Sequence, residues 1–312
     1  MYDLVIIGGG PAGVAAGVYA ARKKLKTIFI TETIGGQSMD SVEIQNWIGT
    51  QKISGLDLAK SLEAHLKAYA ADTVEIKLGA RAERVEKIDS GFVVHVGKET
   101  FEARAVLVAT GGMRRKLSIP GAAEFENKGV TYCASCDGLL FAGQDVAVVG
   151  GGNAGFETAA QLLAYAKSVT LVHRGNDFSK ADKTTVDATL AHPNFKALTN
   201  SEPIEVRGGG PNGPKFVGTL VVKNSATDTV VELAVTGVFV EVGMLPATDL
   251  VKGLVELDQF GRIVVNAKNQ RTSLDGVWAV GDCTDELYHQ NNIAAGDGVK
   301  ALEDIYFWLK RQ

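Results

Sequence analysis

The feature of this 312-residue chain that most constrains its fold is a segment that occurs twice. Residues 4–32 and 146–174 each contain an apolar run, three consecutive glycines, a small-residue stretch typical of a helix, and a second run rich in β-branched residues. Both apolar runs suit buried parallel strands, which are continuous in Val, Ile and Leu. Because each copy is a strand–turn–helix–strand unit, the repeat predicts an α/β protein with two dinucleotide-binding domains.

The glycines of each copy follow a G-x-G-x-x-G pattern. The first glycine allows a tight turn, the second lets the backbone approach a pyrophosphate, and the third lets the helix pack closely on the strand. The phosphates sit at the helix N-terminus, where unpaired N–H groups and the dipole attract anions. Glycines that served helix packing alone would leave the duplication unexplained. The candidate phosphate-binding residues are Gly8, Gly10, Pro11, Ala12 and Gly13 in the first copy, and Gly150, Gly152, Asn153, Ala154 and Gly155 in the second.

The residue that ends each copy indicates which dinucleotide binds there. Glu32 ends the first copy, where its carboxylate can accept hydrogen bonds from ribose hydroxyls and repel a 2′-phosphate. Arg174, preceded by His173, ends the second copy, and an arginine there suits a 2′-phosphate through charge-assisted hydrogen bonds. The pattern therefore predicts FAD in the first domain and NADPH in the second. A solvated charge at a strand end is the alternative for both residues.

Two proline-containing segments predict where the chain crosses between the domains. Ile119-Pro120-Gly121 is typical of a turn, and Met244-Leu245-Pro246 interrupts an apolar run that suits a strand. A strand and an amphipathic helix near the C-terminus return to the character of the first domain. We expect two Rossmann-like, three-layer domains: an FAD-binding domain of residues 1–116 and 246–312, and an inserted NAD(P)H-binding domain of residues 117–245.

Cys133 and Cys136 form a C-x-x-C motif just before the second copy. This spacing allows a disulfide that closes a small ring and cycles between disulfide and dithiol. The alternative is half of a structural zinc site. Such a site needs about four Cys or His ligands, and the sequence offers no second C-x-x-C motif and no suitable His pair. We therefore expect redox chemistry at this pair and no bound metal.

Two aspartates and the third cysteine adjoin these motifs. Asp137 follows the second cysteine and is a candidate acid/base that exchanges a proton with a thiol or flavin. Its alternative role is to cap a helix before Gly138. Asp282, at the expected end of a strand, is predicted to hydrogen-bond a ribitol or ribose hydroxyl, whereas Cys283 is expected to be an inert buried thiol.

The composition argues against several other classes of protein. The 36 Asp and Glu residues outnumber the 32 Lys and Arg residues, and the net charge of −4 disfavours nucleic acid as a main partner. Three cysteines are not a disulfide framework, so a reducing, cytoplasmic setting is expected. Residues 4–21 carry no charge, but five glycines and Pro11 interrupt them and no positive charge precedes them. We therefore expect neither a membrane span nor an export signal.

These motifs, in this order, resemble the low-molecular-weight thioredoxin reductase family, and more closely its branch formed by the flavoprotein part of the alkyl hydroperoxide reductase F subunit. The resemblance covers essentially the whole chain. Besides the two glycine fingerprints, it rests on Gly35-Gly36-Gln37, Ala109-Thr110-Gly111, CASCDG at residues 133–138, and Gly281-Asp282. The segments that resemble the branch in particular are residues 41–47, 129–133, 237–246 and 281–290.

The resemblance implies a mechanism in which a nicotinamide coenzyme gives hydride to FAD and the flavin reduces the Cys133–Cys136 disulfide. Cys136 would be the thiol that faces the flavin, and Cys133 the thiol that attacks an external disulfide. The smaller domain would swivel on hinges near residues 116–120 and 244–246, and the protein would be a homodimer. The FAD contacts implied beyond the first fingerprint are Gly36, Gln37, Asn46, Ala109, Thr110, Gly111, Gly281, Asp282 and Gln290.

The resemblance also bears on where the electrons go. The peroxidase-reductase branch usually carries an N-terminal tandem thioredoxin-fold domain, whereas this sequence begins at the flavin fingerprint. We therefore expect a separate thioredoxin-, glutaredoxin- or peroxiredoxin-like protein as partner. One alternative is a flavin-dependent dithiol oxidase, which makes disulfides with oxygen. Another is a different electron donor such as ferredoxin.

The coenzyme segment departs from the family pattern. NADPH-using members carry His-Arg-Arg followed shortly by Phe-Arg, whereas Gly175 and Ser179 stand here in place of the second and third arginines. Lys180 partly replaces the third. Because two arginines hold a 2′-phosphate better than one, His173, Arg174 and Lys180 predict that NADPH is favoured only modestly over NADH.

Overall fold

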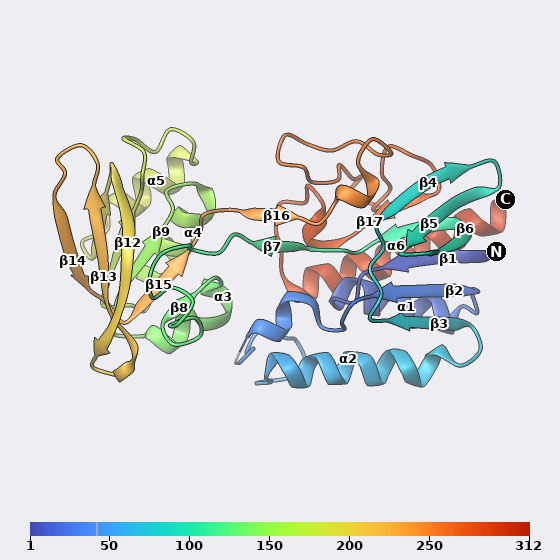
Figure 1. Ribbon diagram of the computed structural model, residues 1–312, viewed down its shortest axis with the longest axis horizontal. Coiled ribbons are helices and arrows are strands. Elements are labelled where there is room, and N and C mark those ends of the chain that lie inside the picture. The colour runs from blue at the N-terminus through green and yellow to red at the C-terminus, as the bar shows by residue number, and fades with distance from the viewer. Residues whose placement is uncertain (42) are drawn as a thin grey trace. The chain divides into compact units, whose positions relative to one another are not determined.

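The computed structural model describes residues 1–41 and 43–312. Two compact units make up the chain: unit 1 comprises Met1–Met113 and Met244–Gln312, and unit 2 comprises Arg114–Gly243 (Figure 1). Each unit contains a largely parallel sheet with helices, so the predicted α/β class is confirmed. The unit boundaries lie within three residues of the expected domain bounds. Which dinucleotide each unit binds stays a prediction.

The sheet of unit 1 has the strand order β3-β2-β1-β6-β5-β4, and β17 pairs with β6. The strands β3, β2, β1, β6 and β17 are parallel, whereas β5 is antiparallel to both β4 and β6. The strand bounds are β1 Tyr2–Ile7, β2 Thr27–Thr31, β3 Val74–Leu78, β4 Arg84–Ile88, β5 Gly91–Val96, β6 Glu99–Val108 and β17 Val277–Ala279.

Alternate residues of β1 enter two different hydrophobic clusters of unit 1. Leu4 and Ile6 pack with three helices, whereas Val5 and Ile7 pack on the opposite face of the sheet. Gly298 allows two of these helices to approach closely, because a Cβ there would overlap the carbonyl oxygen of Ala12. The bounds are α1 Pro11–Arg22, α2 Gly55–Ala70 and α6 Asn291–Arg311, with short 3-10 helices η1 Gly36–Asp40, η3 Asp249–Val251 and η4 Gly281–Cys283.

Unit 2 contains a parallel sheet of strand order β11-β10-β9-β15-β8 and a separate antiparallel sheet of order β12-β13-β14. Buried valines and alanines on one face of the parallel sheet pack toward the antiparallel sheet, and those on the other face pack against α4. The strand bounds are β8 Val130–Thr131, β9 Asp145–Val149, β10 Ser168–Val172, β11 Phe195–Leu198, β12 Ser201–Gly210, β13 Gly213–Asn224, β14 Val230–Ala234 and β15 Gly237–Val240. The helix bounds are α3 Ala134–Asp137, η2 Gly138–Phe141, α4 Asn153–Leu163 and α5 Lys183–Leu190.

The chain passes from one unit to the other after Met113 and again after Gly243. The short strand β7 (Gly112–Arg114) contains the first of these points, and the short strand β16 (Met244–Pro246) begins directly after the second. The two strands pair with each other. The expected first crossing at residues 116–120 therefore lies a few residues inside unit 2. Rotation about these segments stays a prediction.

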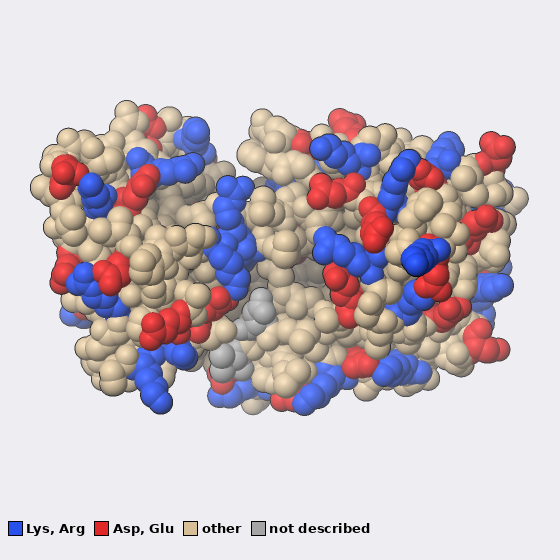
Figure 2. Space-filling view, viewed as in Figure 1, with Lys and Arg blue, Asp and Glu red and all other residues tan. Residues whose placement is uncertain are grey.

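No helix in the described part of the chain is long and apolar enough to cross a membrane. Acidic and basic side chains are interspersed on the face of the molecule that Figure 2 shows.

Candidate functional site

The first glycine turn joins the end of β1 to the start of α1. Gly8 has a φ of +117°, a left-handed backbone that favours glycine, and a Cβ there would overlap the carbonyl oxygen of Ala109. A Cβ at Gly13 would overlap the carbonyl oxygen of Gly8, so only glycine lets α1 pack on the turn. At Gly10, in contrast, a Cβ would meet no protein atom within 4 Å. The backbone of Gly10 is therefore open to a pyrophosphate.

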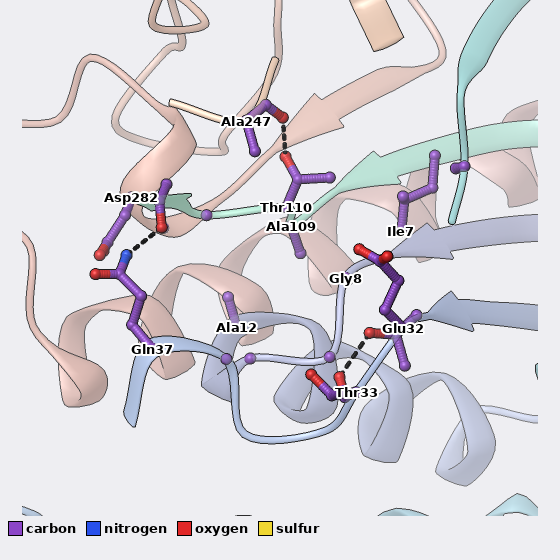
Figure 3. Close-up of a pocket in the computed structure, with 18 of the residues that line it drawn as sticks. Ile7, Gly8, Ala12, Glu32, Thr33, Gln37, Ala109, Thr110, Ala247 and Asp282 are labelled. Carbon is purple, nitrogen blue, oxygen red and sulfur yellow. Dashed lines mark hydrogen bonds between the residues drawn. The ribbon is translucent and has the colours of Figure 1, made fainter. Parts of the chain in front are cut away.

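A cavity of about 530 Å³ opens at this turn (Figure 3). Ligand sites span roughly 300–1,000 Å³, so the volume suits a bound organic molecule. The cavity lies at the carboxyl ends of β1, β2 and β6, the edge at which open α/β sheets bind ligands. The predicted cofactor residues that line it are Gly8, Gly10, Pro11, Ala12, Glu32, Gly36, Gln37, Ala109, Thr110, Gly111, Gly281 and Asp282.

Hydrogen bonds to the backbone fix two polar side chains in the cavity wall. The Nε2 of Gln37 donates to the carbonyl oxygen of Gly112, and the Oγ1 of Thr110 donates to that of Ala247 at 2.6 Å (Figure 3). Glu32 is less constrained, since its side chain is 61% exposed and lies 3.7 Å from Arg81. Its carboxylate thus remains accessible to a ribose hydroxyl.

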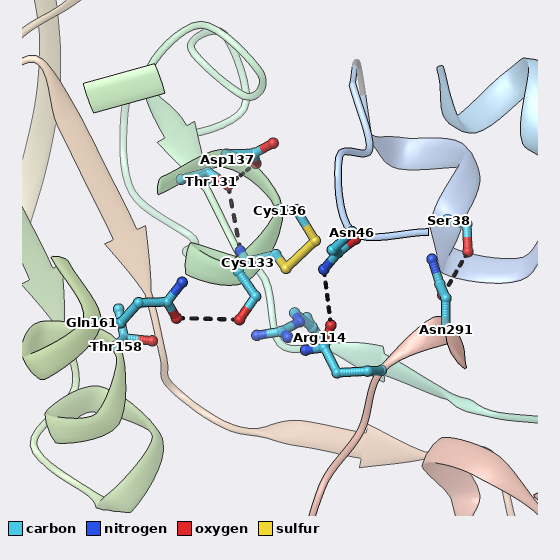
Figure 4. The surroundings of a disulfide bond; sticks show 12 residues. Ser38, Asn46, Arg114, Thr131, Cys133, Cys136, Asp137, Thr158, Gln161 and Asn291 are labelled. Carbon is cyan, nitrogen blue, oxygen red and sulfur yellow. Dashed lines mark hydrogen bonds between the residues drawn. A yellow bond between two sulfur atoms is a disulfide. The ribbon is translucent and has the colours of Figure 1, made fainter. Parts of the chain in front are cut away.

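Three predicted FAD residues do not line the cavity. Gly13 faces the turn itself, as its contact with Gly8 shows. The Nδ2 of Asn46 donates to the Oε1 of Gln290 at 3.1 Å (Figure 4), next to Asn291, which does line the cavity. The structure thus brings together two predicted residues that are 244 positions apart. Val42, which belongs to the same motif as Asn46, lies outside the described residues.

Some lining residues were not identified from the sequence. Arg81 comes from the segment after β3, where no motif marks a ligand, and Ser38 and Asp249 come from short 3-10 helices. Asn291 carried one signal, its position directly after Gln290. The lining residues that the sequence analysis missed include Thr31, Thr33, Ser38, Ala80, Arg81, Gly112, Met113, Asp249, Asn291 and Ala294.

The second glycine turn joins β9 to α4 and repeats the geometry of the first. Gly150 has a φ of +123°, and a Cβ there would overlap the carbonyl oxygen of Glu241 beyond the end of β15. A Cβ at Gly155 would overlap the carbonyl oxygen of Gly150, whereas one at Gly152 would meet nothing within 4 Å. The side chain of Asn153 is used structurally, because its Oδ1 accepts a hydrogen bond from the backbone N of Asp182 at 2.7 Å.

The predicted coenzyme residues follow β10. The ring of His173 packs against the glycine turn, since a Cβ at Gly151 would lie 2.5 Å from its Cγ. Arg174 and Lys180 are exposed, and neither forms an ion pair within residues 1–41 and 43–312. Asp177 lies between them in the chain, and hydrogen bonds from Ser179 lower the pKa of its carboxyl. The segment thus offers two available cations and one carboxylate.

Cys133 and Cys136 form a disulfide in unit 2, with Cα atoms 5.3 Å apart (Figure 4). Cys133 precedes the short helix α3, and its carbonyl oxygen accepts hydrogen bonds from the backbone N of Cys136 and of Asp137. Both cysteines are half-buried. The disulfide thus closes one small ring around the start of a single short helix.

Asp137 lies directly after the disulfide. Its carboxyl accepts a hydrogen bond from the Oγ1 of Thr131, which in turn accepts one from the backbone N of Cys133 at 3.4 Å. Burial raises the pKa of Asp137 above its ordinary value, although the hydrogen bond from Thr131 lowers it. Asp137 makes no side-chain capping bond to η2. Of the two roles predicted for Asp137, the geometry therefore favours that of an acid/base beside the disulfide over that of a helix cap.

The third cysteine is buried in unit 1. The Sγ of Cys283 donates to the carbonyl oxygen of Val280 at 3.3 Å, and burial raises the pKa of its thiol to about 11. A thiol with so high a pKa carries little thiolate at neutral pH. Among the described residues, no group of three His, Cys, Asp or Glu side chains is arranged to hold a metal ion.

The chain belongs to the pyridine nucleotide-disulphide oxidoreductase family, because the family model matches residues 2–298. Within that family, it is 41% identical over 302 residues to the alkyl hydroperoxide reductase F subunit of Pseudomonas putida, covering 96% of this chain. It spans only 56% of the length of that relative. It is also 39% identical over 320 residues to a thioredoxin reductase of Mycolicibacterium smegmatis, covering 100% of this chain and 98% of the relative.

The solved structures give the same result. A thioredoxin reductase from Streptococcus pyogenes MGAS5005 superposes with a TM-score of 0.90 at 35% identity, covering 100% of this chain and 99% of that one. The resemblance to the thioredoxin reductase family is therefore confirmed, and so is the prediction of a thioredoxin reductase-like oxidoreductase as its class. Membership of this family implies FAD and a pyridine nucleotide as cofactors.

Proposed function

We propose that the chain passes electrons from NAD(P)H, by way of FAD in unit 1, to the Cys133–Cys136 disulfide in unit 2. From there they go to the disulfide of a separate protein with a thioredoxin-, glutaredoxin- or peroxiredoxin-like site. The observation that carries the proposal is the C-x-x-C disulfide in the same unit as the second glycine turn. FAD, when bound, accepts a hydride from the nicotinamide and passes on its electron pair.

The residues of unit 1 suit FAD. The open backbone at Gly10, at the N-terminus of α1, would receive the pyrophosphate. The exposed carboxylate of Glu32 would accept hydrogen bonds from the adenosine ribose, and Asp282 would do the same for the ribitol. Gln37 and Thr110 are held by the backbone, so they would present preorganised polar groups.

The residues of unit 2 perform the disulfide chemistry. An electron pair and two protons convert the Cys133–Cys136 bond into two thiols. Cys133, as thiolate, then attacks the partner disulfide, and Cys136 displaces the partner's second sulfur to regenerate the ring. Each exchange moves a proton on or off sulfur, and Asp137 would hold that proton. Its link to Cys133 through the hydroxyl of Thr131 supports this role. The partner leaves with two thiols, so electrons and protons balance.

We further propose that NADPH is modestly preferred over NADH. The available cations Arg174 and Lys180 support this, because a 2′-phosphate would pair with them. Asp177 and the absence of an arginine at Gly175 and Ser179 keep the preference small. The names of the relatives, a peroxidase-reductase component and a thioredoxin reductase, support a protein disulfide as substrate. The homodimer and the cytoplasmic location remain predictions.

Anaerobic titration of the FAD-loaded chain with NADPH and NADH in parallel tests this proposal. We expect about two equivalents of coenzyme per chain, one electron pair for the flavin and one for the disulfide, and about one equivalent in C136S. Equal stoichiometry in the two proteins would reject the disulfide route. A flavin that neither coenzyme reduces would point to another donor such as ferredoxin. Oxygen uptake with dithiol substrates would instead indicate a dithiol oxidase.

A further inference from the structure

The loop between Ile44 and Ile53 carries Asn46 and is closed at its base. The two isoleucines exchange backbone hydrogen bonds of 2.7 and 3.0 Å, which form a short antiparallel bridge. At the tip beyond this bridge, Ile48 is 82% exposed and Asn46 and Trp47 are only half-buried. An exposed tip without a buried side chain needs polar contacts to keep one conformation.

The start of α6 supplies such contacts to the tip. The carboxamide of Asn292 donates from Nδ2 to the carbonyl oxygen of Asn46 at 2.6 Å and accepts at Oδ1 from the backbone N of Ile48 at 3.3 Å. The Asn292 side chain therefore satisfies one backbone acceptor and one backbone donor of the tip, as the backbone of a neighbouring strand does in a sheet. Gln290 adds its bond to the Asn46 side chain, and Asn291 accepts a hydrogen bond from the buried Ser38 at 2.9 Å (Figure 4).

We propose that Asn292 is a positioning residue of the flavin site. Its carboxamide holds the carbonyl oxygen of Asn46 and the backbone N of Ile48. These two bonds keep the Asn46 side chain hydrogen-bonded to Gln290, the residue next to Asn291 in the cavity wall. Asn292 does not itself line the cavity, so it acts through Asn46. The inference rests on the proposed binding of FAD in this cavity and extends it to a residue that no glycine motif marks.

Three variants of the full chain test the inference. N292L has a similar shape and loses both hydrogen bonds, whereas N292D keeps an acceptor for Ile48 and loses the donor to Asn46. N194L makes the same change at an exposed asparagine of unit 2 and serves as the matched control. Hydrogen exchange of the Ile48 amide is measured without flavin, and the dissociation constant of FAD is measured by flavin fluorescence. Thermal unfolding of the flavin-free proteins shows whether each variant folds.

We expect N292L to speed exchange at Ile48 and to weaken FAD binding about tenfold, the effect of losing two neutral hydrogen bonds. N292D should keep slow exchange at Ile48 while binding FAD with intermediate affinity. N194L should match the wild type in both measurements. The unfolding midpoints of all variants should agree, because the tip is exposed.

Two results would overturn the inference while leaving the proposed function intact. One is unchanged Ile48 exchange in N292L, and the other is faster exchange with unchanged FAD affinity. If the wild-type chain binds no FAD, the proposed function fails together with the inference. The flavin absorption spectrum adds an independent readout. If Asn46 contacts FAD as proposed, its displacement would alter the polarity around bound flavin, whereas a loss of global stability would not.

Discussion

Gly8 and Gly150 open the two glycine turns with φ values of +117° and +123°, and each is in contact with the carbonyl oxygen of a residue beyond a central strand. Gly13 and Gly155 each pack against the carbonyl oxygen of the first glycine of their own turn. The middle glycines both face open space. The glycine turns of unit 1 and unit 2 therefore have the same backbone geometry.

The surroundings of the two turns differ. The residue whose carbonyl crowds the first glycine is Ala109 in unit 1 and Glu241 in unit 2. Glu241 is nearly buried, accepts hydrogen bonds from Thr158 and Arg114, and has its pKa raised by burial. The strand that follows the helix ends near a carboxylate in unit 1 and near a His-Arg pair in unit 2. From this difference we infer that both turns are built to hold a phosphate, and that the neighbouring residues determine which nucleotide each turn suits.

The largest expected effect comes from filling the third glycine of each turn. Valine at Gly13 or Gly155 would overlap a backbone oxygen, so we expect each change to lower the free energy of unfolding of its own unit by about 3 kcal/mol. All three tryptophans, Trp47, Trp278 and Trp308, belong to unit 1. Tryptophan fluorescence should therefore report the destabilisation in G13V, whereas G155V should shift only the transition seen by circular dichroism. Equal shifts in both signals from either variant would contradict the expectation that each turn stabilises only its own unit.

The same substitution at the middle glycine should separate binding from folding. G10V and G152V place the side chain in open space, so the unfolding midpoint should change little. Each valine would occupy the position of a pyrophosphate, and we expect about 10²-fold weaker binding of one nucleotide only. G10V should weaken FAD and spare the coenzyme, and G152V should do the reverse. Calorimetric titration measures both affinities, and a loss of both nucleotides in one variant would disprove the assignment of the turns.

The third largest effect is expected from replacing Asp137. This residue lies beside the disulfide, which is present in unit 2 and not among the described residues of unit 1. D137N removes the group that we propose holds the proton, and we expect disulfide reduction to slow about 10²-fold. Burial raises the pKa of Asp137, so its carboxyl stays protonated to higher pH than an exposed aspartate. The wild-type rate should therefore fall as pH rises through that pKa, whereas the D137N rate should lack this limb. Stopped-flow rates across pH check the prediction, with flavin reduction by coenzyme as the step that should not change.

The residues that could be predicted from the sequence pattern alone are those whose structural role depends on their immediate neighbours, whereas Gln37, Asn46 and Gln290 were expected only because of the family resemblance. A glycine needed for a positive φ, a β-branched run or a C-x-x-C ring is visible within a few positions, and the two turns and the disulfide followed from such patterns. Arg81 in the cavity wall and the contacts of Asn292 depend on loops that meet across the fold. The bond from Thr131 to Asp137 could not be foreseen either, because it depends on how the chain turns after β8.

The smallest expected effect concerns the charge that ends the second repeat. R174A removes an exposed cation, and we expect the KM for NADPH to rise about tenfold while that for NADH changes less than about twofold. The control is R207A, on the antiparallel sheet, where the arginine pairs with Glu205 and Glu232 and contributes little at the surface. Steady-state kinetics with both coenzymes measure the difference. If R174A raises both KM values equally, Arg174 does not bind the 2′-phosphate. The charge at the end of the second repeat would then not explain a difference in coenzyme preference between the two turns.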